Sequence, residues 1–434
     1  MSKLKERLNE KILGWRPRTK KLQKEYGDVV VDQVKIEQIL GGARSVKCLV
    51  TDISYLDPLE GIRFRGYTIK EILERLPKPK GKEMPYVEGL FYLLLTGEIP
   101  TCDEIKELLE EFRQRKSVPN YVYDVLKAMP NDSHPMSMIS AAVLSLQKES
   151  IFAKKYQEGI NKNDYWEYFF EDALNLLAKL GTIAAYIYRL KYKNGDIIES
   201  NDNLDFGGDF AHMMGINPPY DDVARMFFIL HSDHENGNVS AHAGHMVASA
   251  LSDVYLSTSA MLNGLAGPLH GLANQEVLIW IQGVIEKMGG KIPNEEETRE
   301  FVNQTLESGK VIPGYGHAVL RKTDPRYEAQ REYALKHLPD DDLFKFVSNL
   351  YKVVPEILLA HGKAKNPWPN VDAHSGVIQW YYGLREYDFY TVLFGVGRAF
   401  GVLSNIIWDR ALLYPIERPK SLTTDMLEKI AGIK

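Results

Sequence analysis

The chain has 434 residues, of which 44% are hydrophobic and 26% are charged, a balance that excludes intrinsic disorder and predicts a large buried core. Its 53 lysines and arginines face 58 aspartates and glutamates, and the net charge of -5 excludes broad nucleic-acid binding by a basic surface. Two cysteines are too few for a disulfide framework or a four-thiolate zinc site.

The N-terminal residues 1–18 predict an amphipathic helix, because Leu4, Leu8 and Ile12 recur at every fourth position. Charged residues of both signs interrupt this stretch, which therefore lacks the apolar core of a signal peptide. Together with the low cysteine content, this favours the cytoplasm, with the mitochondrial matrix as the alternative for a eukaryotic source.

The clearest alternation of period two lies between residues 29 and 69. Val46, Cys48 and Val50 would face one side of a strand, and Gly61 and Gly66 punctuate the run. We therefore expect a minor β element near the N-terminus.

Helical periodicity dominates the rest of the chain, so the fold class is expected to be mainly α. A kink is expected at Pro355, which cannot donate a backbone hydrogen bond. The apolar stretch 246–268 is interrupted by Asp253, which favours a buried helix over a membrane span. The predicted helices cover residues 87–95 (ending at Gly97), 136–146, 166–190, 223–230, 344–359 and 392–413.

The segment 231–245 contains four histidines in two H-x-x-H pairs, a spacing that a metal site could use. Gly237 and Asn238 break the helix between the pairs, and no H-E-x-x-H motif is present. Hydrogen bonding within the core or at helix ends is therefore the preferred interpretation for three of them, with His234 open as a donor to an anion. A metal-dependent hydrolase remains the alternative that this cluster would support.

Three segments rich in glycine and proline, 264–268, 313–316 and 366–370, precede His270, His317 and Asp372 in turn. Loops that place polar groups beside such breaks are often functional, although each alone also fits a simple turn. No serine or cysteine occupies a nucleophile elbow, so two histidines and a carboxylate suit proton transfer best. The alternative is a non-catalytic protein in which all three side chains are structural.

Four arginines, Arg321, Arg326, Arg398 and Arg418, lie in the same half of the chain. Guanidinium groups bind carboxylates and phosphates through two parallel hydrogen bonds. A small polyacid is therefore a natural ligand, although each arginine alone also suits a surface position.

Three longer motifs resemble the citrate synthase family of the mitochondrial, type I kind. They are Gly264-Leu-Ala-Gly-Pro-Leu-His270-Gly, Val311-Ile-Pro-Gly-Tyr-Gly-His317-Ala and Lys365-Asn-Pro-Trp-Pro-Asn-Val-Asp372. The resemblance extends to residues 56–66, 231–242 and 417–420, so it spans nearly the whole chain. It implies an almost wholly α-helical fold with two domains, in which residues 1–271 and 379–434 form the large domain and residues 272–378 the small one. It also implies that the small domain closes over the substrate.

The resemblance implies that Asp372 removes a methyl proton from acetyl-CoA while His270 hydrogen-bonds the thioester oxygen. His317 would then protonate the carbonyl of oxaloacetate, and hydrolysis of citryl-CoA would release citrate and CoA, the opening step of the tricarboxylic acid cycle. No cofactor or metal is expected, and neither is a nucleic-acid or membrane partner. The nearest alternative activity is that of a 2-methylcitrate synthase, which uses propionyl-CoA; one methylene allows only about 10–200-fold discrimination.

The resemblance also implies the ligand contacts. Oxaloacetate would bind His234, Arg326, Arg398 and Arg418, the last contributed by the other subunit of a homodimer. Lys162 departs from the arginine that is common in relatives, which keeps the charge but loses the fork. The CoA contacts implied are Arg44, Lys162, Val311, Gly314, Gly316, Arg321, Lys363, Lys365 and Asn370.

Overall fold

The computed structural model describes residues 2–362 and 364–433, and nearly all regular structure in this part of the chain is helical. The expected mainly α class is confirmed, including a small β element. Every predicted helix is present, with somewhat different ends. The helix that contains Pro355 continues through it as one element, Asp342–His361.

The N-terminal part holds one long helix, a short helix and a three-stranded antiparallel sheet of order β1-β2-β3. Ser2 caps the first helix, whose Leu4, Leu8 and Ile12 are buried as expected. The predicted strand through Val46, Cys48 and Val50 is wrong, because the segment is largely exposed and pairs with no strand in the described part of the chain. The sheet forms further on. The elements are α1 (Lys3–Tyr26), α2 (Ile36–Leu40), β1 (Ser54–Asp57), β2 (Gly61–Phe64), β3 (Tyr67–Thr68) and α3 (Ile69–Arg75).

A bundle of helices follows and forms most of the apolar core. Its helices begin repeatedly at residues that cap a helix N-terminus, such as Thr101, Asn238 and Asp253, whose side chains accept backbone hydrogen bonds from the first turn. The elements are α4 (Val87–Thr96), α5 (Cys102–Arg115), α6 (Asn120–Ala128), α7 (Pro135–Ser145), η1 (Leu146–Glu149), α8 (Ile151–Gln157), η2 (Lys162–Asp164), α9 (Tyr165–Tyr192), α10 (Phe206–Met214), α11 (Tyr220–His231), α12 (Val239–Ser249) and α13 (Val254–Leu265).

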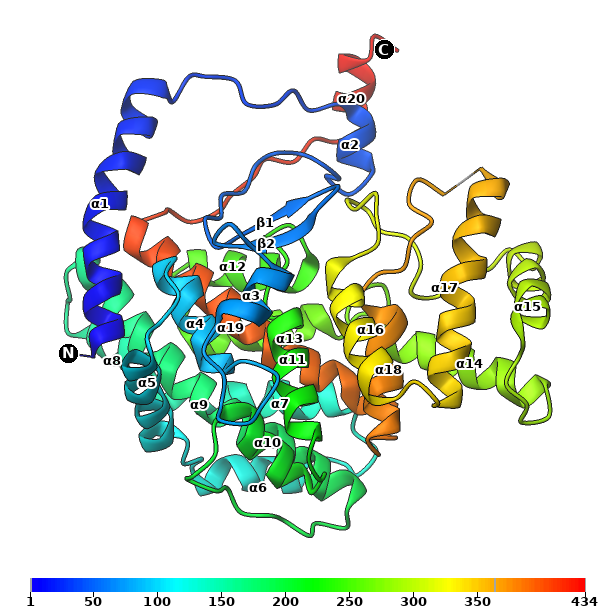
Figure 1. The fold of residues 1–434 in the computed structure, drawn as a ribbon. Helices are drawn as coiled ribbons and strands as arrows, with labels where there is room; N and C mark the ends of the chain where they lie inside the picture. The colour runs from blue at the N-terminus through cyan, green and yellow to red at the C-terminus, as the bar shows by residue number, and fades with distance from the viewer. Residues whose placement is uncertain (1, 363, 434) are drawn as a thin grey trace.

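Five further helices lie together on one side of the molecule (Figure 1). They fall within residues 272–378 or just beyond, the segment expected to be the small domain, whose boundaries stay a prediction. We call this group the side block. It comprises α14 (Ala273–Lys287), α15 (Glu295–Glu307), α16 (Pro325–His337), α17 (Asp342–His361) and α18 (Asp372–Tyr381).

The chain then returns to the bundle through η3 (Tyr387–Phe389) and α19 (Tyr390–Leu412), and ends with α20 (Thr424–Ile430). In the described part of the chain, one stretch, Tyr387–Leu412, is long and apolar enough to cross a membrane by length and composition. An apolar window of 18 residues within it is entirely buried in the protein, between helices that include α9, α11, α12 and α13, so packing in the core accounts for its composition.

Two glycines let α19 approach α11 closely. A Cβ atom at Gly401 would lie 2.3 Å from the carbonyl oxygen of Ser232, and one at Gly397 would lie 2.9 Å from that of Phe228. This approach brings Arg398, which lies between them, to the C-terminal end of α11. The core packing thereby places a charged side chain at the candidate site.

Candidate active site

His270 lies in the turn between α13 and α14, and its ring faces the start of α12. The backbone N–H of Ser240 donates to His270 Nε2 at 3.3 Å, and the Ser240 hydroxyl lies 2.9 Å from the same nitrogen. Because Nε2 accepts from a backbone N–H, the proton of the neutral ring is on Nδ1. His270 therefore presents Nδ1–H as a free donor.

His317 has the opposite tautomer. The backbone N–H groups of Val319 and Leu320 donate to its Nδ1 at 3.0 and 3.1 Å. The ring proton is therefore on Nε2, which lies on the side of the ring away from its own loop. The two histidines thus present different nitrogens as donors.

Asp372 is the first residue of α18, and its backbone N–H donates to Asn370 Oδ1 at 3.0 Å. The Asn370 amide in turn donates to the carbonyl oxygen of Gly316 at 3.1 Å, which ties the loop before Asp372 to the loop before His317. Gly314 has a left-handed φ of +80°, and a Cβ atom there would lie 2.8 Å from Ala373 Cα. Only glycine fits this approach, which brings the two loops together.

Burial shifts the pKa values of these three groups so that, near neutral pH, the carboxylate can accept a proton and the two histidines can donate one. Burial raises the pKa of Asp372 to about 6, against a smaller opposing effect of Arg326. Burial, with a smaller contribution from a nearby arginine, lowers the pKa of both His270 and His317 to about 4. Asp372 Oδ1 is buried without a hydrogen-bond partner in the described structure. At pH 7 the site therefore holds a poorly solvated carboxylate and two neutral N–H donors.

Three more predicted residues, His234, Arg326 and Arg398, lie beside this group. The rings of His234 and His317 are 5.3 Å apart between centroids, and His234 Nε2 is buried with no partner among the described residues. Burial, followed by the charge of Arg326, lowers the pKa of His234 well below its usual value. Arg326 binds the buried Asp324 through Nε and Nη2, which leaves Nη1 open. An anion entering here would meet arginine and imidazole donors together.

Arg398 is fully buried and is aimed by three contacts. Its Nε donates to the carbonyl oxygen of His231 at 3.0 Å, and its Nη1 donates to Asn238 Oδ1 at 3.0 Å and to Ser240 Oγ at 3.2 Å. Burial lowers its pKa to about 10, so the guanidinium stays charged. Ser240 contacts both Arg398 and His270, which couples an anion-binding group to an acid–base group.

The remaining histidines of segment 231–245 make internal hydrogen bonds, as expected. His231 Nδ1 lies 2.8 Å from the Phe227 carbonyl oxygen, His242 pairs with Glu417 and His245 with Asp409. The helix is broken between the two pairs, since α11 ends at His231 and α12 begins after Asn238. Within residues 2–362 and 364–433, no three His, Cys, Asp or Glu side chains are grouped as a metal ion would need.

The predicted CoA contacts are only partly gathered at the loop between 311 and 321. Val311 is 79% exposed at its start, and Gly314 and Gly316 both have left-handed φ angles. The Arg321 guanidinium donates to carbonyl oxygens of its own loop, including that of Val319 at 2.7 Å. Lys365 is exposed, Asn370 joins the two loops as described, and Lys363 lies outside the described residues.

Three predicted residues are not brought to the cluster within one chain. Arg44 and Arg418 are exposed, and neither side chain has a hydrogen bond or ion pair with the described residues. Lys162 lines a separate pocket of about 330 Å³ with Tyr165 and Arg410. A single chain therefore brings together the three predicted catalytic residues and most of the predicted oxaloacetate contacts, but not these three residues.

Sequence reasoning missed two residues that shape the site. Ser240 contacts His270 from 30 positions away, and no local pattern announces such a contact. Asp324 could have been found: an aspartate directly before Pro325 is a signal for a helix start, and its carboxylate accepts from the Arg326 backbone at 2.9 Å. The helix cap thereby also orients the arginine.

The fold and the site together define a helical protein in which a buried carboxylate and two neutral histidines lie beside arginine donors suited to an anion. The family model for the citrate synthase C-terminal domain matches residues 42–420. A mitochondrial citrate synthase of Xiphias gladius is 52% identical over 99% of this chain and 92% of its own, and one of Daucus carota is 53% identical over 98% and 90%. The citrate synthase structure from Pyrobaculum aerophilum shares 27% identity, with a TM-score of 0.77 over 91% of this chain and 97% of its own.

A second solved citrate synthase, from Thermotoga maritima, is 26% identical with a TM-score of 0.72 over 90% of this chain and 96% of its own. The chain belongs to the citrate synthase family. Its fold is that of the solved members, and it is an enzyme of that family.

Proposed function

We propose that this enzyme condenses acetyl-CoA with oxaloacetate and hydrolyses the resulting citryl-CoA to citrate and CoA. The observation that carries the assignment of roles is the pairing of a buried, unpartnered carboxylate at Asp372 with two neutral histidines of opposite tautomer. The relatives reported above are named citrate synthases, and none of these observations favours propionyl-CoA. Acetyl-CoA is therefore the substrate that we propose, and 2-methylcitrate synthesis is not.

The first step forms an enolate equivalent from the thioester. Asp372 takes a proton from the acetyl methyl group, and the electron pair of that C–H bond moves toward the thioester oxygen. A carboxylate is a weak base for a carbon acid, so the step needs a donor where the negative charge develops. His270 supplies it through Nδ1–H, the nitrogen that Ser240 leaves free.

The second step joins the two substrates. The methyl carbon attacks the ketone carbon of oxaloacetate, and the ketone oxygen becomes a hydroxyl by taking the Nε2 proton of His317. His234, Arg326 and Arg398 would hold the carboxylates of oxaloacetate, because each keeps a nitrogen without a hydrogen-bond partner among the described residues and the charges of both arginines act on His234. Water then cleaves the thioester, its hydroxyl going to the acyl carbon and its proton to the sulfur, so that CoA leaves as its thiol. The proton taken by Asp372 is released and His317 regains one, which resets both groups.

The proposed scheme uses no cofactor, because side chains of the enzyme take and give the protons that are transferred in its first two steps. Acetyl-CoA is a substrate, held in our proposal by Val311, Gly314, Gly316, Arg321, Lys363, Lys365 and Asn370, with Arg44 and Lys162. The side block would close on oxaloacetate and keep water from the enolate until the new bond has formed. The mitochondrial names of the curated relatives favour the mitochondrial matrix over the cytoplasm that we first expected.

The direct test follows free CoA thiol after purified enzyme is mixed with acetyl-CoA, with and without oxaloacetate. We expect release that depends on oxaloacetate and is slower with propionyl-CoA. Equal release without oxaloacetate would mean a simple thioesterase. No release under either condition would contradict the proposed reaction.

The pH dependence of kcat/KM for acetyl-CoA is expected to show one acidic limb near pH 6. The base works only when ionised, so the rate should fall about tenfold for each pH unit below the Asp372 pKa of about 6. The histidines, with pKa values of about 4, remain neutral donors throughout this range. A profile flat from pH 5 to 8 would rule out Asp372 as the titrating base.

We also propose a homodimer in which Arg418 of one chain completes the oxaloacetate site of the other. It is exposed and without a side-chain bond within its own described chain, as a residue with a partner in a second subunit would be. Mixing Arg418→Ala chains with Asp372→Asn chains tests this. Each variant alone should be inactive, but random re-pairing should restore about a quarter of the wild-type rate, since half of the dimers then hold one intact site. No recovery after denaturation and joint refolding would mean that Arg418 acts within its own chain.

A further inference from the structure

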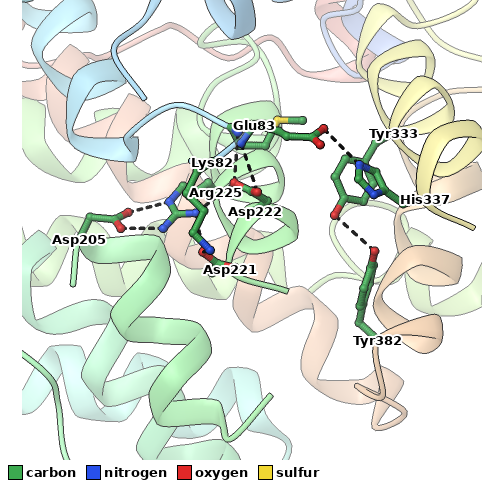
Figure 2. Close-up of polar contacts among 10 residues, drawn as sticks. Lys82, Glu83, Asp205, Asp221, Asp222, Arg225, Tyr333, His337 and Tyr382 are labelled. Carbon is green, nitrogen blue, oxygen red and sulfur yellow. Dashed lines mark hydrogen bonds and ion pairs between the residues drawn. The ribbon is translucent and has the colours of Figure 1, made fainter. Parts of the chain in front are cut away.

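Glu83 makes the ion pairs that join the helical bundle to the far end of α16. It lies in the loop between α3 and α4, and its carboxylate accepts from Lys336 Nζ at 2.6 Å. It also accepts from His337 Nε2 at 3.1 Å, the contact that Figure 2 draws. Hydrogen bonding from Lys336 lowers the pKa of Glu83, so the carboxylate is ionised at neutral pH. The contact spans more than 250 positions of sequence.

The loop that carries Glu83 is itself anchored to the start of α11. The Asp222 carboxylate accepts from the backbone N–H groups of Glu83 and Met84 at 3.2 and 3.1 Å. Arg225 holds Asp222 in turn, at 3.1 Å, and also pairs with the buried Asp205 (Figure 2). Because a buried network fixes its backbone, Glu83 is a rigid point of attachment.

Aromatic packing also holds the ring of His337 in place. Its ring packs against that of Tyr333 at 4.3 Å between centroids, and the Tyr333 and Tyr382 hydroxyls lie 3.3 Å apart (Figure 2). Beside this contact, α3 and α16 are separated by a groove of about 300 Å³, which Glu83 and Lys336 line. Because the groove interrupts the apolar packing between α3 and α16, polar contacts join the bundle to α16 at this point.

Glu83 is connected to two helices, to α16 directly and to α11 through Asp222, and both helices lead to the candidate active site. α11 ends at His231, whose carbonyl oxygen binds Arg398, while α16 begins with Pro325 and Arg326. A helix of twelve or thirteen residues is about 18–20 Å long, so the Glu83 contact lies about that far from the oxaloacetate site. Each helix has one end at the site and the other at Glu83.

We propose that Glu83 is a positioning residue, which acts through Lys336 and His337 to hold α16 so that Arg326 lies in register with Arg398 and His234. This rests on the proposed function, in which Arg326 binds oxaloacetate. At the near end, α16 is fixed by Pro325 against Gly61, where an added Cβ would lie 2.4 Å from the proline ring. Glu83 adds a polar anchor at the far end to the packing of α16 on α18, and without it we expect this end of the helix to shift.

The test compares Glu83→Gln with Glu332→Gln. Glu332 is an exposed carboxylate on α16 that lines the same groove but makes no ion pair in the described structure, so it controls for loss of charge alone. In Glu83→Gln we expect the KM for oxaloacetate to rise about twofold to fivefold, the factor of a partly exposed ion pair, with kcat nearly unchanged. The control should change neither.

A charge exchange separates positioning from general destabilisation. Glu83→Lys should raise the KM for oxaloacetate further, because it places like charges together, and adding Lys336→Glu should return it to within about twofold of wild type. The proposal would be overturned by an unchanged KM in Glu83→Gln, or by a fall in kcat as large as the rise in KM. It would also be overturned if the KM of the double variant did not recover.

Amide hydrogen exchange gives a result that does not depend on turnover. Glu83→Gln should speed exchange in residues 325–337, and Glu332→Gln should not. Unchanged exchange there overturns the positioning role, whatever the enzyme catalyses. Absence of oxaloacetate-dependent CoA release from the wild type would instead contradict the proposed function, so the two failures are distinct.

Discussion

Asp372→Asn is expected to abolish turnover while making the folded enzyme more stable above pH 6. General base catalysis typically contributes about 10²–10⁴-fold, and an amide cannot take the methyl proton. Asparagine has the same shape and keeps the backbone contact to Asn370. CoA release should therefore fall by at least about a hundredfold, with oxaloacetate binding largely retained.

The gain in stability follows from the direction of the Asp372 pKa. Burial raises it from 3.8 to about 6, so the carboxyl group stabilises the fold below pH 4 relative to higher pH, and this contribution is lost as the pH rises through 6. At pH 8 the buried charge costs on the order of 2–3 kcal/mol. The amide removes that cost, so the melting temperature of Asp372→Asn should exceed that of wild type at pH 8 but not at pH 4.

Asp342→Asn is the matched control, because Asp342 is an exposed aspartate in the first turn of α17. It should leave both turnover and the pH dependence of melting unchanged. If Asp372→Asn kept more than about a tenth of the activity, Asp372 would not be the base. If it failed to fold, Asp372 would be a structural carboxylate.

His270→Ala and His317→Ala are expected to stop the reaction at different steps. Loss of one oriented donor to a developing oxyanion typically costs about 10²–10³-fold. His270→Ala should lose enolisation, and with it exchange of the acetyl methyl protons for deuterium in D₂O. His317→Ala should keep that exchange but lose citrate formation, because only the second step uses it.

Methyl exchange by mass spectrometry, measured with oxaloacetate or an unreactive dicarboxylate present, separates these outcomes. His212→Ala is a suitable control, because the side chain of this exposed histidine of α10 makes one hydrogen bond in the described structure, to the Glu199 carbonyl oxygen. It should change neither exchange nor citrate formation. If His317→Ala lost exchange as completely as His270→Ala, the assignment of separate tasks would be wrong.

The long helices were predictable because each provides many apolar positions at helical spacing. The predicted stretches 166–190 and 392–413 became Tyr165–Tyr192 and Tyr390–Leu412, with only the ends displaced. The expected strand through Val46 to Val50 failed for a physical reason: alternation favours a strand only when one face is buried against a partner. Here the segment is largely exposed, and the sheet formed where Phe64 is buried.

For the candidate site, the acid–base residues predicted from the sequence lie close together in the fold, but their protonation could not be predicted. Glycine and proline breaks marked the turns that carry His270 and His317, and the resemblance assigned their tasks. The tautomers depend on backbone N–H groups, those of Ser240 and of Val319 and Leu320, whose directions are set only once the helices have packed. Glu83 was missed for the same reason, because nothing in the sequence around this single glutamate indicates a partner more than 250 residues away.

The position of α19 in the chain has a consequence for biosynthesis. This helix is the last long element to be made, yet it packs against α4, α9, α11, α12 and α13, which come much earlier. Until residue 412 has left the ribosome, the faces of those helices that α19 covers have no partner, although the helices can already pack against one another. The nascent chain must therefore carry exposed hydrophobic faces through most of its synthesis, and final folding awaits its C-terminal end.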